Sequence, residues 1–160
     1  MAERFSVDPI ATADDLGAVA DLFAGYAASL PVDLGYQDFA TELAGLPGKY
    51  AAPEGALLLA RDAGGRAIGC AGLRPLGNGI CEMKRLFLLP EARGLGLGRA
   101  LAQAIVATAR ERGYRTIRLD TLPSMASAIA LYEELGFHRI EPYYAPTPPG
   151  TVFMEFQLAP

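Results

Sequence analysis

The sequence of 160 residues has no tryptophan, one histidine and two cysteines, and these scarcities exclude several classes of protein. One histidine and two cysteines cannot supply a convincing zinc site, so we expect a metal-free protein. Two cysteines also cannot staple a secreted scaffold and are typical of a reducing compartment. Cys70 and Cys81 lie in apolar runs whose hairpin would not place them opposite one another, so no disulfide is expected.

Long apolar runs are also lacking, since none reaches the roughly 18 residues of a membrane span. The N-terminal residues do not show the pattern of a secretory signal peptide. Positive charge is scarce too, because 14 lysines and arginines stand against 18 acidic residues, a net charge of −4. An acidic balance argues against nucleic-acid binding and fits a positively charged substrate. We therefore expect a cytoplasmic protein without membrane or nucleic-acid partners.

What the chain does have is an ordinary globular composition, 51 % hydrophobic and 20 % charged. Its length is that of one domain with a full core, so we expect residues 1–160 to form a single domain. Apolar periodicity predicts strands at Phe5–Ile10, Ala56–Arg61, Ala67–Arg74, Ile80–Leu88, Arg115–Asp120, Phe137–Glu141 and Val152–Leu158. Helices are predicted between Thr12 and Pro31, at Tyr36–Leu46, from the glycines near position 96 to Gly113, and at Ser127–Leu135.

Glycine turns join the early strands as hairpins, whereas helices join the later ones. The predicted fold is therefore α/β (α+β), with one mixed sheet of about seven strands flanked by about four helices. The sheet should be antiparallel in its N-terminal part and parallel around the ligand site proposed next.

The most informative segment is Glu82–Ala100, where an apolar strand-like run leads through Pro90 and a glycine-spaced turn into a helix. The first amides of a helix lack internal partners and the helix dipole is positive there, so this unit forms an anion cradle. Glycines let the backbone approach a phosphate, and Arg93 and Arg99 add positive charge. The segment predicts a site for a phosphate-bearing ligand.

Spacing narrows the choice of ligand. No lysine follows the glycines as a Walker loop requires, and neither Gly94 nor Gly96 begins a complete G-x-G-x-x-G frame. Asp120, at the end of the next predicted strand, is the one feature that favours a ribose-binding nucleotide fold. The pattern R-x-x-G-x-G, in contrast, is complete at Arg93, Gly96 and Gly98.

That pattern is the pyrophosphate-binding motif of the GCN5-related N-acetyltransferase (GNAT) superfamily, which this chain resembles. The segment Ala128–Phe137 is similar to the family's late helix with its Tyr-x-x-x-Gly-Phe signature, and the motifs follow the family's order. The resemblance covers residues 56–157. It implies the acyl-CoA N-acyltransferase fold and transfer of the acetyl group of acetyl-CoA to a primary amine of a small molecule or protein, by direct attack in a ternary complex.

The resemblance also implies which residues bind acetyl-CoA. Backbone groups of Leu86, Phe87 and Leu88 would pair with the pantetheine amides as an added strand does, and one amide could donate to the oxyanion. The pyrophosphate would lie on the turn, with Arg93 as its charged anchor. The turn residues assigned to the cofactor are Arg93, Gly94, Leu95, Gly96, Leu97, Gly98 and Arg99.

Acetyl transfer needs a base for the amine and an acid for the leaving thiolate, because an amine of pKa about 10.4 is mostly charged at neutral pH. Glu82 lies at the offset before Arg93 at which the histone acetyltransferase branch carries its base. The alternative is an exposed Glu82 paired with Lys84 or Arg74. Tyr132 matches the tyrosine that protonates the coenzyme A sulfur in family members, and its alternative is simple packing.

One position departs from the family pattern. Relatives often place an asparagine that contacts the coenzyme seven residues before the tyrosine, and this chain has Met125 there. Either Ser124 or Ser127 makes that contact, or the contact is absent. The expected walls of the acceptor site are Leu30–Phe39, with Asp33, Tyr36 and Asp38, and Glu141–Gly150, with Tyr143 and Tyr144.

Two other functional classes remain open from the sequence. One is a non-catalytic acyl-CoA-binding module of the same fold, in which Glu82 and Tyr132 are structural. The other is a Rossmann-type nucleotide-binding domain that uses Asp120 for a ribose. Many relatives pair as dimers, so the resemblance also leaves a homodimer open.

Overall fold

A computed structural model describes residues 4–158 as a seven-stranded sheet flanked by helices. The strand order is β1-β2-β3-β4-β5-β7-β6, and of the described pairs β4 and β5 alone are parallel. The strands are β1 (Phe5–Pro9), β2 (Ala56–Asp62), β3 (Ala67–Gly77), β4 (Ile80–Leu88), β5 (Thr116–Thr121), β6 (His138–Ile140) and β7 (Val152–Gln157). The predicted mixed sheet is confirmed, and its antiparallel first four strands contradict the doubly wound nucleotide-binding alternative.

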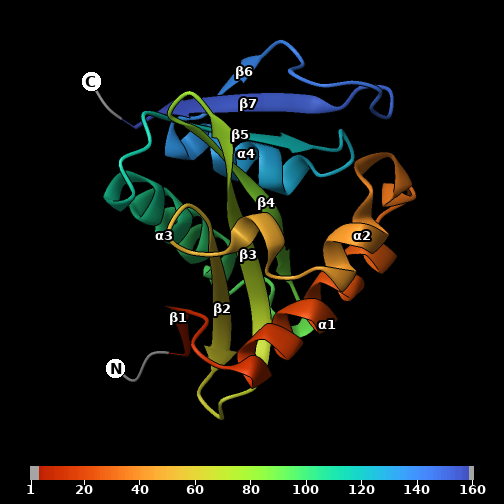
Figure 1. The fold of residues 1–160 in the computed structure, drawn as a ribbon. Coiled ribbons are helices and arrows are strands. Elements are labelled where there is room, and N and C mark those ends of the chain that lie inside the picture. The colour runs from red at the N-terminus through yellow and green to blue at the C-terminus, as the bar shows by residue number, and fades with distance from the viewer. Residues whose placement is uncertain (1–3, 159–160) are drawn as a thin grey trace.

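Four α-helices cover the two faces of this sheet, α1 and α2 on one and α3 and α4 on the other (Figure 1). They are α1 (Ala13–Ser29), α2 (Phe39–Ala44), α3 (Leu97–Glu111) and α4 (Ala126–Leu135). Short 3-10 turns lie at η1 (Leu34–Gln37), η2 (Gly48–Tyr50) and η3 (Pro90–Ala92). Within residues 4–158, no helix combines the length and the apolar character needed to span a bilayer.

The predicted single helix at Tyr36–Leu46 is wrong, because the chain forms two shorter pieces there, η1 and α2. Asp38 stands between them with a φ of 55°, in the left-handed region that breaks a helix. Asp33 begins the first piece by accepting a hydrogen bond from the Gly35 amide at 2.7 Å. The break redirects the chain and leaves Gln37 at the end of η1.

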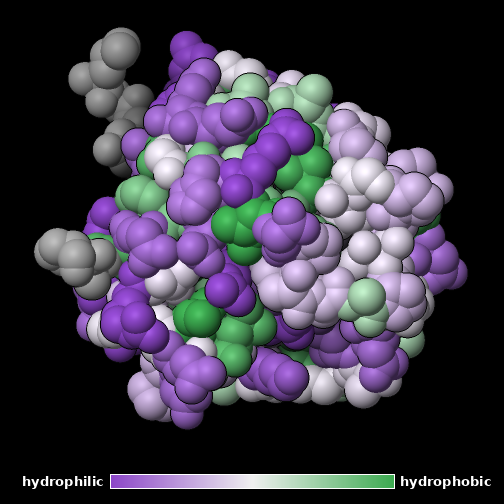
Figure 2. Space-filling view, turned by 90° about the horizontal axis from the view of Figure 1, so that it is seen from above, coloured by the Kyte–Doolittle hydropathy of each residue, from purple (hydrophilic) through white to green (hydrophobic). Residues whose placement is uncertain are grey.

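Two hydrophobic cores, one on each face, hold the sheet between the helices. Leu97, Leu101 and Ile105 of α3 are fully buried in one core, and Val19 and Phe23 of α1 in the other. Burying each such side chain contributes about 1.5–3 kcal/mol, so both faces are firmly packed. Seen from above, apolar residues gather at the surface in small patches among hydrophilic ones (Figure 2).

A β-bulge in β4 changes which side chains face which core. Cys70 pairs with Phe87 but Gly72 pairs with Lys84, so one residue of β3 opposes two of β4. Arg85, within the bulge, has a φ of 61°. Met83 consequently lies in the α3 core and Phe87 in the α1 core, although strict alternation would put both on one face. Alternation from Cys81 and Met83 puts Lys84 on the face that α1 and α2 cover, and the bulge puts Arg85 on that face as well.

Candidate active site

The glycine-spaced turn leads from η3 into α3 and stays open in front of the backbone. Gly94 and Gly96 both have a φ of 81°, a conformation that residues with a Cβ rarely adopt. A Cβ built on either glycine would meet nothing within 4 Å. Gly96 is the N-cap of α3 and offers no side chain to the first amides of the helix. These amides can therefore bind an anion, as the sequence predicts for this turn.

The arginines of the turn lie at its surface. Arg93 and Arg99 are both exposed, and Arg99 forms an ion pair with Glu134 of α4. Leu97 is fully buried in the α3 core, so only its backbone can face a ligand. Leu95, in contrast, is 40 % exposed. The turn is thus anchored by Leu97 and presents its glycines and Arg93 outward.

The later half of β4 has a free edge within the described residues. Pairing between β4 and β5 ends where Glu82 meets Arg118, whereas β5 remains paired with β7 as far as Thr121. On its other side β4 stays paired with β3 at Phe87 and Leu88. Strands that part in this way leave backbone amides and carbonyls that an extended ligand can pair with. This edge includes the Leu86–Leu88 segment singled out in the sequence.

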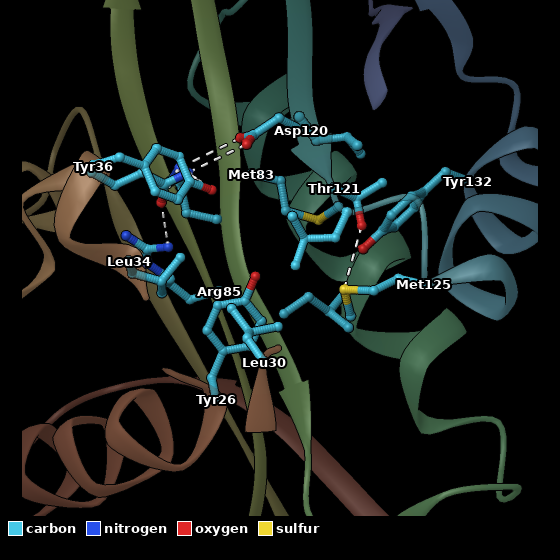
Figure 3. Close-up of a pocket in the computed structure, with 15 residues that line it drawn as sticks. Tyr26, Leu30, Leu34, Tyr36, Met83, Arg85, Asp120, Thr121, Met125 and Tyr132 are labelled. Atoms are coloured by element: carbon cyan, nitrogen blue, oxygen red, sulfur yellow. Dashed lines mark hydrogen bonds and ion pairs between the residues drawn. The ribbon is translucent and has the colours of Figure 1, made fainter. Parts of the chain in front are cut away.

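A cavity of about 30 Å³ lies where β4 and β5 part, bounded also by α1, η1 and the start of α4. Tyr26 of α1 and Tyr132 of α4 point their hydroxyls toward it from opposite sides (Figure 3). Polar side chains on its lining include Gln37, Lys84 and Asp120. The cavity has room for about one or two water molecules, with charged groups on one side and tyrosine hydroxyls on the others.

Tyr132 lies in this cavity, where the sequence predicts an acid. It is 6 % exposed and its ring packs against Phe137, with 5.8 Å between the ring centroids. Burial raises the pKa of the Tyr132 hydroxyl. The group therefore stays protonated at neutral pH and can give a proton to a thiolate. It packs and also faces the cavity, so the geometry is compatible with both the catalytic and the packing interpretation.

Glu82 is buried and fully engaged, with 1 % of the residue exposed. Its Oε1 accepts a hydrogen bond from Arg74 Nε at 2.8 Å and lies 4.0 Å from Lys84 Nζ. Its Oε2 accepts from the Tyr143 hydroxyl at 2.5 Å. Among residues 4–158, the lining of the cavity includes its neighbours Met83 and Lys84 but not Glu82 itself. The predicted ion pairs thus occur, but on a covered face.

Asp120, considered in the sequence only as a ribose ligand, is a carboxylate that does line the cavity. Its Oδ2 accepts from the Tyr144 hydroxyl at 2.7 Å and from Gln37 Nε2 at 3.3 Å. Its Oδ1 lies 3.5 Å from Lys84 Nζ. Alternation along β5 could have located it, because Ile117 and Leu119 face the α3 core and Asp120 must then face the other side.

Two buried cations lie on this side of the cavity, Lys84, considered in the sequence only as a partner of Glu82, and Arg85, which was not singled out. Burial lowers the pKa of Lys84, whose side chain is only 4 % exposed. Arg85 binds Glu42 through Nε and Nη2, both at 3.0 Å. Burial opposes the charge of Arg85, but the hydrogen bonds and charge of Glu42 outweigh it and raise the Arg85 pKa. Alternation along β4 could have placed Lys84 on this side, whereas the bulge that places Arg85 there has no local signal in the sequence.

The two segments expected to wall the acceptor site do meet here. Leu30, Leu34, Tyr36 and Gln37 line the cavity from one side, while Tyr143 and Tyr144 reach Glu82 and Asp120 from the connection between β6 and β7. Asp33 and Asp38 bond within their own turns instead.

Met125 stands at the position of the family's coenzyme-binding asparagine. Met125 lines the cavity, where its sulfur accepts from the Thr121 hydroxyl at 3.5 Å. Ser124 and Ser127 are exposed.

A mixed sheet whose fourth and fifth strands part, with a glycine turn between β4 and α3, is the fold of the acyl-CoA N-acyltransferases. The family model described as "Acetyltransferase (GNAT) family" matches residues 22–137. The chain belongs to this family, and the resemblance seen in the sequence is confirmed.

Relatives agree with this assignment over nearly the whole chain. An uncharacterized N-acetyltransferase of Schizosaccharomyces pombe is 38 % identical over 157 residues, which is 98 % of this chain and 96 % of the relative. A crystal structure assigned as an acyl-CoA N-acyltransferase from Klebsiella pneumoniae is 31 % identical, with a TM-score of 0.75 over 96 % of this chain and 97 % of that one. A phosphinothricin acetyltransferase from Sinorhizobium meliloti, solved with acetyl-CoA, shares the fold at 23 % identity, with a TM-score of 0.73 over 98 % of this chain and 90 % of that one.

Proposed function

We propose that the protein transfers the acetyl group of acetyl-CoA to a primary amine, by direct attack in a ternary complex. The observation that carries the proposal is an open glycine turn that follows β4, together with a free edge of β4 whose residues line a cavity that holds Tyr132. The turn amides suit a pyrophosphate, and the β4 edge suits the amides of a pantetheine arm. The relative from Sinorhizobium meliloti, which binds acetyl-CoA with the same fold, supports this choice of co-substrate.

In this reaction the amine nitrogen bonds to the acetyl carbon while the bond from that carbon to sulfur breaks. The amine proton passes to a carboxylate, and Tyr132 gives its proton to the departing thiolate. A backbone amide in the later half of β4 can hold the oxyanion between these steps. Tyr132 suits its part because burial keeps the hydroxyl protonated.

Two carboxylates compete for the amine proton. We propose Asp120 as the base, because it lines the cavity together with Tyr132. Glu82, predicted from the motif offset, remains the alternative and would act through the hydroxyl of Tyr143, which binds it at 2.5 Å. Neither assignment needs a metal ion.

Calorimetry with acetyl-CoA, coenzyme A and NAD tests the cofactor site without any assumption about the acceptor. We expect micromolar binding of both coenzymes and none of NAD. Gly96→Asp should abolish that binding, because it forces a side chain into a left-handed position and sets a negative charge against the pyrophosphate. Gly17→Ala, in the second turn of α1 with nothing within 4 Å of a new Cβ, is the matched control and should bind normally.

The same titrations, together with an assay for free thiol, distinguish the proposed function from a non-catalytic binding module. Failure of both coenzymes to bind the wild-type protein would refute the proposed function. Tight binding of acetyl-CoA without release of free thiol in the presence of amines would identify a non-catalytic binding module instead.

A further inference from the structure

The carboxamide of Gln37 occupies the centre of the charged side of the cavity. Its Oε1 accepts hydrogen bonds from Arg85 Nη1 at 2.6 Å and from Lys84 Nζ at 3.2 Å. Its Nε2, which carries two hydrogens, lies within hydrogen-bond distance of three oxygens, the Tyr144 hydroxyl at 2.8 Å, the Tyr36 hydroxyl at 3.1 Å and Asp120 Oδ2 at 3.3 Å. One neutral group thus satisfies two cations at one end and a carboxylate at the other.

The charged side chains around Gln37 suit a ligand that carries full charges better than they suit a neutral carboxamide. The side chains of Lys84, Arg85 and Asp120 are only 4 %, 2 % and 6 % exposed, so water screens them poorly. Two buried cations that converge on one oxygen favour a full negative charge at that point over the partial charge of a carbonyl. Asp120 and the Tyr144 hydroxyl favour an ammonium or amine at the other end in the same way.

We propose that the acceptor is an amino acid-like molecule that takes the place of the Gln37 carboxamide. Its carboxylate lies between Lys84 and Arg85, and its amine lies against Asp120 and the Tyr144 hydroxyl. The nitrogen and oxygen of a carboxamide are separated by one carbon and those of an α-amino acid by two, so the two groups span similar lengths. A zwitterion also leaves the charge balance of this buried cluster unchanged. This inference rests on the proposed acetyltransferase function and names the acceptor class.

Gln37 also stands where such a molecule would come in. The cavity of about 30 Å³ is too small for an amino acid while Gln37 fills its charged side. A groove of about 370 Å³ lies beyond, bounded by α2, η2 and Arg74, and this is within the usual size of small-molecule sites. Of the described residues, Gln37 is the one that lines both spaces. Rotation of its side chain would join the groove to the cavity and bring the amine beside Asp120 and Tyr132.

The matched comparison is between each L-amino acid and the amine that lacks only its carboxylate, such as leucine and isopentylamine. Lys84 and Arg85 keep their carboxylate partners, but an amine without a carboxylate does not replace the oxygen that both take from Gln37, and a site built for hydrogen bonding penalises that loss. Free-thiol release from acetyl-CoA should show at least one amino acid with a kcat/KM roughly 100-fold above its decarboxylated amine. Equal or faster acetylation of the amines, or no transfer to any of the twenty amino acids, would overturn the inference.

Calorimetry on the same protein preparation distinguishes failure of the proposed function from failure of the inferred acceptor class. A protein that does not bind acetyl-CoA contradicts the proposed function itself. A protein that binds acetyl-CoA and acetylates amines without regard to a carboxylate retains the function and loses only the acceptor class. Titration of the responsive amino acid into the complex with coenzyme A should show binding without turnover, which the decarboxylated amine should not reproduce.

Substitutions test whether the preference for an amino acid over its amine arises from the charged residues around Gln37. Lys84→Met should reduce the preference for amino acid over amine by about 10-fold or more, since one carboxylate partner is lost. Arg61→Met removes another cation from the same sheet, one that pairs with Asp15 of α1 and does not line the cavity, and should leave the preference unchanged. Gln37→Ala removes the group that competes with the substrate and should tighten amino acid binding several-fold. Weaker binding by Gln37→Ala, or an equal loss of preference in both cation variants, would contradict the placement.

Discussion

At the scale of single residues, the cavity combines a protonated phenol, a carboxylate and two cations. Tyr132 comes from α4, Asp120 from β5, and Lys84 and Arg85 from β4. Each is held in place by a neighbour, the phenol ring by Phe137, Asp120 by Tyr144 and Arg85 by Glu42. Such fixed positions are what proton transfer between substrate and side chain requires.

Replacement of Tyr132 by phenylalanine tests its role as the acid. We expect kcat to fall by about 10²–10⁴-fold while affinity for acetyl-CoA changes little, because the ring still packs and only the proton donor is lost. Since burial raises the pKa of this hydroxyl, it stays protonated above neutral pH and the loss should persist to about pH 9. Tyr114→Phe, remote from the cavity, is the control, and full activity of Tyr132→Phe would leave Tyr132 with a packing role.

The choice of base is tested by comparing Asp120→Asn with Glu82→Gln. Asp120→Asn should lower kcat by about 10²–10⁴-fold at neutral pH, with a smaller loss at higher pH, where more of the amine is already neutral. Glu82→Gln should cost less, and melting curves would show whether either variant is misfolded. A larger loss in Glu82→Gln, with its own change in the pH–rate profile, would return the role of base to Glu82.

At the scale of elements, two irregularities of the backbone position the residues of the candidate site. The β4 bulge brings Lys84 and Arg85 to one face, and the positive-φ glycines let the chain enter α3 with its first amides exposed. Regular elements provide the support, since Leu97 and Leu101 fix the start of α3 in the core. Backbone irregularities next to a ligand site are common because they re-aim side chains and amides.

Helix α1 offers a pair of substitutions with opposite expected effects on stability. Thr12 Oγ1 accepts from the Asp15 amide at 3.1 Å, and Asp15 Oδ2 accepts from the Thr12 amide at 3.3 Å. Thr12→Ala breaks this capping box and should cost about 1 kcal/mol, or roughly 2–4 °C in Tm. Gly17→Ala should instead stabilise by about 0.5–1 kcal/mol, because Gly17 lies in the second turn of the helix with free space around it. Thermal melts that show both shifts in one direction would contradict this view of α1.

At the scale of the whole molecule, buried and half-buried ion pairs link different elements of the fold. Glu42 of α2 binds Arg85 of β4, and Arg74 of β3 binds Glu82 of β4. Arg118 of β5 binds Glu155 of β7. Pairs of this kind fix elements in register, but loss of one partner is costly because the other is left buried and uncompensated.

Acid should therefore destabilise the protein in part through Glu42. Burial alone would raise the pKa of this carboxyl, but the hydrogen bonds and charge of Arg85 outweigh it, so the pKa lies below its usual value. A carboxyl with a lowered folded-state pKa stabilises the protein above its unfolded pKa of about 4.3, and that stability is lost as pH falls through the folded value. Urea unfolding should show a midpoint that declines below about pH 5.

A variant isolates this contribution. Glu42→Gln should lose on the order of 3 kcal/mol at neutral pH, since Arg85 remains buried without its countercharge, and should decline less steeply on acidification. Glu111→Gln, at the exposed end of α3, should keep the wild-type slope. Identical slopes for Glu42→Gln and wild type would show that Glu42 does not contribute to acid unfolding.

Much of this molecule was predictable because the relevant signals are local. The capping box at Thr12, the hairpin glycines and the glycine turn before α3 all specify backbone conformation within a few residues. The helix break at Asp38 was not predicted, because the residue pattern that predicts a helix continues across Asp38. The cofactor turn and Tyr132 were accessible from motifs, and their roles stay predictions until the binding and kinetic measurements are made.

The sequence by itself determined most of the order of elements, the mixed sheet and the glycine turn before α3, because periodicity, caps and glycine conformations act over short stretches of chain. Only the tertiary structure decided which side chains form the charged side of the cavity. Gln37 meets Lys84 47 residues away and Tyr144 107 residues away. Such contacts depend on strand register, and the bulge at Arg85 shifts that register by one residue and turns side chains to the opposite face. No local pattern encodes that shift.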